Sequence, residues 1–134
     1  MKNLTVFLFL SLILFSCNKN KEEENPVIAD HPLFGYWVSQ EMEEDVFVMD
    51  KSEGFLTDRY GFAFYPDGGF GENKNSGECG TPPIHYRVFN GTWHYVSGNF
   101  YEIHVGYWGG TITYRIELIY LDSETLKFRY HYNF

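Results

Sequence analysis

The residues of this sequence that could do chemistry are five histidines, two cysteines and a run of carboxylates. A hairpin would bring His94 and His104 near one another, with Glu102 as the nearest further ligand. Zinc needs three or four ligands, and the chain has neither Cys-x-x-Cys nor His-x-x-x-His spacing. We therefore predict no metal site, and a solvent-facing cross-strand pair is the expected arrangement.

Nucleophilic and acid–base chemistry also lack their usual partners in this sequence. Cys79 lies in "SGECGTPP" with His85 six residues further on. A nucleophile needs a base within hydrogen-bond reach that is oriented by a third group, and no pattern supplies that group. The carboxylates of "EMEEDVFVMD" are too clustered to act as an acid and a base across a cleft. We expect no catalytic residue, no cofactor and no enzyme.

The other cysteine, Cys17, follows a short apolar segment. Lys2 provides a positive charge and Leu4 to Phe15 an apolar run, which is typical of a secretory signal. The run is shorter than the about 20 residues that span a bilayer. The charged stretch after Cys17 ends at Pro32 and cannot bury enough apolar surface to order itself. The predicted parts are a signal (1–16), a flexible acidic tether (17–32) and one globular domain (33–134).

The residues around Cys17 resemble the lipobox of bacterial lipoproteins. "LILFSC" places Leu14 three positions and Ser16 one position before the cysteine. The resemblance implies that the Cys17 thiol is lipidated, with palmitate among the expected acyl chains, and that the peptide is cut before it. Several acyl chains on one residue would anchor the protein stably. The alternative is an ordinary secretory signal with an incidental cysteine.

The first residues after Cys17 indicate where in the cell envelope the protein is expected. Asn18 stands where an Asp would favour retention in the inner membrane of enterobacteria, so passage to the outer membrane is expected. "KEEE" at positions 21–24 resembles the signal that takes Bacteroidetes lipoproteins to the cell surface. A solvated charge run is the alternative reading of this stretch. We expect a lipid anchor in the outer membrane and exposure at the cell surface.

Composition limits the partners and the source of stability. The formal net charge is −8, from 18 acidic and 10 basic residues. Phosphate binding needs clustered Lys and Arg, so nucleic acid is not an expected partner. With Cys17 lipidated, Cys79 has no intramolecular disulfide partner. Stability must come from the core, and 20% aromatic residues favour a pleated sheet.

From Gly35 onward, apolar and polar residues alternate in short runs separated by turn residues. A turn at Ser97, Gly98 and Asn99 would pair Tyr95 with Tyr101 and Trp93 with Ile103 on one face, and His94 with Glu102 on the other. The last hairpin is expected to face the core with Ile112, Tyr114, Ile116, Leu118, Leu126, Phe128, Tyr130 and Tyr132. We predict an all-β fold: an antiparallel up-and-down meander of about eight strands that hides its edges by closing into a barrel.

The globular part resembles the small lipocalin-like domains of bacterial lipoproteins. "GYW", Gly35 to Trp37, stands where lipocalins carry Gly-x-Trp at the start of their first strand, and "FYPDGGF" and "CGTPPIHY" before "GTW" are similar to that group. The resemblance implies that Trp37 plugs the closed end of the barrel. It also implies that an Arg near the last strand packs on this Trp. Arg129 is the first candidate and Arg115 the second.

Three classes of function remain open for this sequence, and an enzyme is the third of them. The first is a binding protein for a small apolar or glycan ligand at the end opposite Trp37, with Tyr65, Tyr86, Tyr107 and Trp108 as its residues, because each combines a ring face with a polar tip. The same rings could instead merely cap the core. The second class is a protein-interaction or inhibitor module with a filled barrel. A membrane-embedded barrel is a further alternative, because "FRYHYNF" alternates aromatics up to the last residue.

Overall fold

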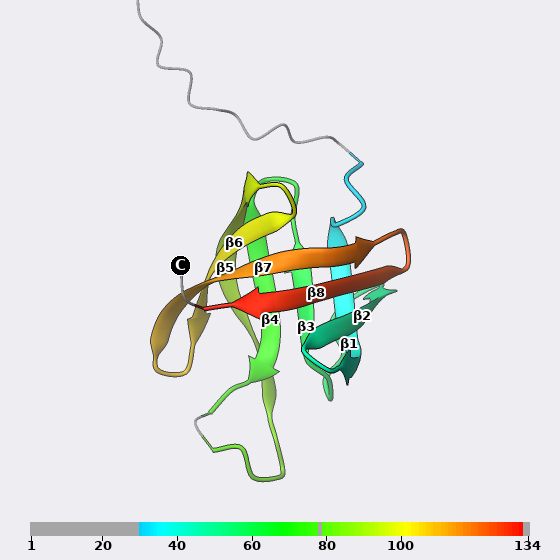
Figure 1. Ribbon diagram of the computed structural model, residues 1–134. Helices are drawn as coiled ribbons and strands as arrows, with labels where there is room; N and C mark the ends of the chain where they lie inside the picture. The colour runs from blue at the N-terminus through cyan, green and yellow to red at the C-terminus, as the bar shows by residue number, and fades with distance from the viewer. Residues whose placement is uncertain (1–29, 78, 133–134) are drawn as a thin grey trace, which may run out of the picture.

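The computed structural model describes residues 30–77 and 79–132 (Figure 1). The predicted signal peptide, Cys17 and most of the predicted tether lie outside the described residues. In the described ranges no helix is long and apolar enough to cross a membrane. The elements are β1 (Gly35–Glu43), β2 (Val46–Ser52), β3 (Gly61–Phe64), β4 (Gly69–Asn75), β5 (Tyr86–Ser97), β6 (Phe100–Tyr107), β7 (Gly110–Leu121) and β8 (Thr125–His131).

These eight strands form a closed antiparallel barrel, which confirms the predicted fold class. The strands β3 to β8 follow one another around the barrel as a meander. The hairpin of β1 and β2 closes the ring, with β1 paired to β3 and β2 paired to β8. The first hairpin therefore sits in the ring in reversed order, and the chain must cross over β1 to pass from β2 to β3.

The connection between β2 and β3, residues 53–60, crosses on the outside of the barrel. The ring of Phe55 lies edge-on to Tyr36 of β1, with 5.1 Å between ring centroids. A Cβ placed at Gly61 or Gly71 would come within 3.3 Å or 3.2 Å of the Phe55 ring. The outer face of β3 and β4 is therefore built of residues small enough to let this segment lie flat on it.

The hairpin of β5 and β6 has the register predicted from its turn. Trp93 pairs with Ile103, and Tyr95 pairs with Tyr101. His94 pairs with Glu102 on the opposite face, where the imidazole Nε2 lies 3.7 Å from the carboxylate. Side chains alternate between the two faces of a strand, so the position of the turn fixes which residues pair and which face each pair occupies.

Trp37 is fully buried, as expected, at the end of the barrel where the described chain begins. Its indole Nε1 donates a hydrogen bond to the Leu33 carbonyl at 2.8 Å. The predicted Arg129 contact is wrong, because Arg129 follows the core residue Phe128 and must point outward. The cation over the Trp37 ring is Lys51 of β2, whose Nζ lies 4.2 Å from the ring centroid.

The centre of the barrel is filled by side chains. The fully buried large residues are Trp37, Phe62, Phe64, Phe70, Phe128, Leu33, Met49, Ile103, Ile116, Leu126 and Val105. Aromatic rings dominate, and Phe62 contacts both Phe70 and Phe128 with centroids 5.1 Å and 5.2 Å apart. An eight-stranded barrel has an interior just wide enough for such packing. Space for a ligand is therefore expected at an end of the barrel, not at its middle.

Candidate functional site

A buried carboxylate marks the open end of the barrel, which is the end opposite Trp37. In β4, alternation from the core residue Phe70 carries Glu72 to the interior. The Glu72 residue is only 4% exposed. A charged side chain at such a depth is destabilising unless it is paired and hydrogen-bonded.

Three donors reach the Glu72 carboxylate. The Tyr60 hydroxyl donates to Oε1 at 2.6 Å and the Tyr114 hydroxyl to Oε2 at 3.2 Å. The Lys74 ammonium, two residues along the same strand, lies 2.8 Å from Oε2. The Tyr60 hydroxyl also contacts the Tyr130 hydroxyl. Elements distant in sequence therefore join in one polar network on the floor of the open end.

The tyrosines of this network act as hydrogen-bond donors at neutral pH. Burial raises the pKa of the Tyr60, Tyr114 and Tyr130 hydroxyls well above the usual range. Their proximity to Glu72 and to one another acts in the same direction for Tyr60 and Tyr114. Ionisation is suppressed, so the three phenols keep their hydrogens, and those of Tyr60 and Tyr114 are donated to Glu72.

Two hollows open above this floor. The floor hollow has a volume of about 410 Å³ and is lined by Phe47, Tyr60, Glu72, Lys74, Ile112, Tyr114, Tyr130 and Tyr132. The rim hollow has a volume of about 370 Å³ and is lined by Lys74, Asn75, Gly77, Gly80, Tyr107, Trp108 and Ile112. Each reaches the size range of small-molecule sites, and both combine aromatic walls with a few polar groups.

The structure brings two of the four predicted ligand residues together. Tyr107 and Trp108 line the rim hollow, and their rings meet edge to face with centroids 5.6 Å apart. Tyr86 lies at the same end of the barrel, opposite Asn75 in the ladder, but lines neither hollow.

Tyr65 does not belong to this group. It follows β3 at the closed end, where its hydroxyl lies 3.4 Å from the Tyr36 hydroxyl and its carbonyl accepts a hydrogen bond from the Trp93 indole. Placing Tyr65 at the open end was therefore wrong, because β3 runs toward the Trp37 end and its following turn lies there.

The sequence reasoning missed the residues on the floor. These are Tyr60, Glu72, Lys74, Tyr114, Tyr130 and Tyr132, of which only the last hairpin's tyrosines were placed on the core side. A signal existed for two of the others, because the two-residue period from Phe70 puts Glu72 and Lys74 on the inner face of β4. A charged residue in a core-facing position of a strand is the pattern that points to such a site.

None of the five histidines lines either hollow, and Cys79 lies beside the rim hollow, where its carbonyl accepts a hydrogen bond from the lining residue Asn75. His104 Nδ1 contacts the Thr113 hydroxyl at 2.8 Å on the outer face. Among residues 30–77 and 79–132, no group of three His, Cys, Asp or Glu side chains could hold a metal ion. Cys79 is exposed, and a hydrogen bond with the Thr81 hydroxyl, 2.8 Å away, lowers its pKa. A hydroxyl is not a general base, so this contact does not activate the thiol for catalysis.

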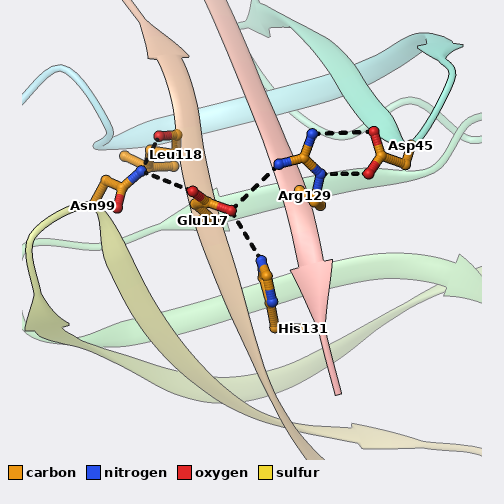
Figure 2. Close-up of polar contacts among 6 residues, drawn as sticks. All are labelled: Asp45, Asn99, Glu117, Leu118, Arg129 and His131. Atoms are coloured by element: carbon orange, nitrogen blue, oxygen red, sulfur yellow. Dashed lines mark hydrogen bonds and ion pairs between the residues drawn. The ribbon is translucent and has the colours of Figure 1, made fainter. Parts of the chain in front are cut away.

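The outer face of β7 and β8 carries a separate ionic network (Figure 2). Arg129 binds Asp45 with two hydrogen bonds of 2.5 Å and 3.1 Å. Glu117 accepts hydrogen bonds from Arg129 at 3.5 Å and His131 at 3.0 Å. These groups are solvent-exposed or partly so, and they tie the turn after β1 to the last two strands.

No protein-family model, curated protein sequence or solved structure matches this chain.

Proposed function

We propose that this protein is a lipid-anchored lipoprotein of the cell envelope whose barrel binds a small ligand at the end opposite Trp37. The observation that carries the proposal is the buried Glu72 network beneath the floor hollow. A buried ion pair adds little net stability, and replacing it by apolar residues is often neutral or stabilising. Its presence where the barrel opens supports a role in binding.

The shape of the site favours some ligands over others. The floor hollow has largely apolar walls, and its polar groups include the Tyr60 and Tyr114 hydroxyls, which are hydrogen-bonded to Glu72. Immediately beneath, Phe62 and Phe128 are fully buried and fill the barrel. A compact ligand with an apolar face and polar edges suits this geometry better than a long acyl chain that must enter the core.

The fluorescence of Trp108 offers a direct test. Trp108 is 53% exposed in the rim hollow, whereas Trp37 and Trp93 lie buried in the other half of the barrel and provide a constant background. We expect its emission to shift on titration with at least one of three probe classes: oleate, protoporphyrin and short glycans. Trp108→Phe should abolish the shift.

A matched pair of substitutions then locates the site. Tyr114→Phe removes a hydroxyl that donates to Glu72 and should weaken binding of the active probe by about fivefold or more. Tyr120→Phe removes an exposed hydroxyl at the far end of β7, bonded to Asp122, and should leave the affinity unchanged. Equal effects of the two variants, or no response to any probe, would reject the proposal.

The filled barrel centre also favours a second candidate, a surface module that contacts another protein through its exposed loops. Trp108 and Tyr132 would then be contact residues, since aromatic side chains are enriched at protein interfaces. If none of the three probe classes shifts the Trp108 emission, this becomes the better hypothesis.

A further inference from the structure

The floor hollow and the rim hollow are neighbours that share two walls, Lys74 and Ile112. Each hollow has its own exposed aromatic ring. Tyr132, 59% exposed, borders the floor hollow and stacks on Tyr130, with centroids 5.5 Å apart and planes at 17°. Trp108, 53% exposed, borders the rim hollow. Two ring platforms thus flank one lysine.

We propose that the open end binds a neutral oligosaccharide, with one sugar ring in the floor hollow and the next in the rim hollow against Trp108. This inference rests on the proposed function, because it names the ligand class and the two subsites of the same site. Lys74, at the junction, would donate hydrogen bonds to the hydroxyls between the two rings.

The charges of the site exclude ionic ligands as its best occupants. Among the described residues that line the two hollows, Glu72 and Lys74 carry the charges, and they neutralise each other at 2.8 Å. An ammonium ligand would have to displace Lys74 from a carboxylate that already has three donors. An acidic ligand would have to compete with Glu72 for Lys74. Neither kind of ligand gains a free countercharge from the described lining residues.

The buried side chains below the floor hollow leave no room for a ligand with a long apolar chain. The side chains beneath the floor are at most 1% exposed, and among them Phe62 contacts both Phe70 and Phe128. A sugar ring needs no such depth, because it presents an apolar C–H face to an aromatic ring and hydroxyls at its edge. The exposed rings of Tyr132 and Trp108 and the O–H and N–H groups between them match both features.

Isothermal titration calorimetry on the full-length protein tests the inference with defined probes. These are maltotetraose, cellotetraose, mannotetraose and chitotetraose, each beside its own monosaccharide. We expect at least one tetrasaccharide to bind about tenfold or more tightly than its monosaccharide, since the second ring adds contacts with Trp108.

Two variants separate the subsites. Trp108→Ala should reduce the affinity for that tetrasaccharide by about tenfold and leave monosaccharide affinity within about twofold, because the first ring occupies the floor hollow. Tyr132→Ala should weaken both. Equal affinity for monosaccharide and tetrasaccharide, or an equal loss of both on Trp108→Ala, would overturn the two-subsite arrangement.

The ligand class can fail independently of the proposed function. Tighter binding of tetragalacturonate, spermine or oleate than of every neutral saccharide would overturn the oligosaccharide and leave a functioning site at the open end. If none of these probes binds and no probe shifts the Trp108 emission, the proposed function is overturned as well.

Discussion

At the scale of single residues, Lys51 takes the place that the lipocalin resemblance assigned to an arginine. Lys51 lies directly opposite Trp37 in the β1–β2 ladder, so both side chains point to the same face of the sheet. Its ammonium lies over the indole and donates to the carbonyl of Phe34. Burial lowers the pKa of Lys51. The closed end is thus capped by a cation from β2.

Trp37→Ala should destabilise the barrel strongly, because Trp37 is fully buried and its indole N–H is bonded to Leu33. The loss should be about 3 to 5 kcal/mol, which lowers the melting temperature by about 12 °C or more. Trp108→Ala is the control, since Trp108 is exposed and should change the melting temperature by less than about 2 °C. Equal melting of both variants would contradict this placement of Trp37.

Glu117 should make the outer ionic network sensitive to acid. Hydrogen bonds from His131 and Asn99 lower the pKa of its carboxyl in the folded state. A lowered folded-state pKa means that the stabilisation is present above the unfolded-state value of about 4.3 and is lost as the pH falls through the folded-state value. The network therefore stabilises the barrel at pH 6 and ceases to do so in strong acid.

Thermal melting of wild type and Glu117→Gln at several pH values measures this effect. At pH 6 the variant should melt about 2 to 4 °C lower, a small difference because the groups are accessible to solvent. The two curves should converge below about pH 3.5. A difference that stays constant from pH 6 to pH 3 would show that the carboxyl's charge is not involved.

At the scale of elements, the crossover between β2 and β3 decides how the barrel closes. Asn73 of β4 is 4% exposed, and its amide donates to the carbonyls of Leu56 and Arg59, at 2.7 Å each. These two bonds hold the crossing segment on the outer face, beside the small residues that admit Phe55. One side chain thus secures the unusual strand order.

Asn73→Ala should lower the free energy of unfolding by about 2 kcal/mol, because the buried Asn73 amide and its two hydrogen bonds to the crossing segment are lost. The melting temperature should fall by about 10 °C. Asn75→Ala is the matched control: Asn75 donates to the exposed Cys79 carbonyl, and its loss should change the melting temperature by about 2 °C or less. Indistinguishable melting of these two variants would mean that Asn73 does not hold the crossover.

At the scale of the whole molecule, the described chain enters the barrel at its closed end. The His31 carbonyl accepts a hydrogen bond from the Phe34 N–H, and Leu33 is buried against the core. A lipid on Cys17 would therefore attach to the protein from the side of Trp37. The anchor would then join the domain at the end opposite the floor and rim hollows.

Cys17→Ser should abolish lipid attachment. Cells grown with a palmitate analogue should label the wild type and Cys79→Ser equally, and should not label Cys17→Ser, because Cys79 lies within the globular domain and outside the lipobox. The Cys17→Ser protein should also no longer partition with outer membranes. A wild-type protein that takes up no label would refute the lipid anchor.

The sequence by itself determined the strands and their faces, because side-chain alternation and turn residues are local properties. The pairing of Trp93 with Ile103 and the inward row from Ile112 to Leu118 followed from spacing alone. Only the tertiary structure decided which strands meet. Closure of the first hairpin against β3 and β8 brings Tyr60, Glu72 and Tyr130 into contact, and no local pattern specifies that neighbourhood. The same closure places Tyr65 at the end of the barrel opposite Trp108, because β3 pairs antiparallel with β1 and therefore runs toward the Trp37 end.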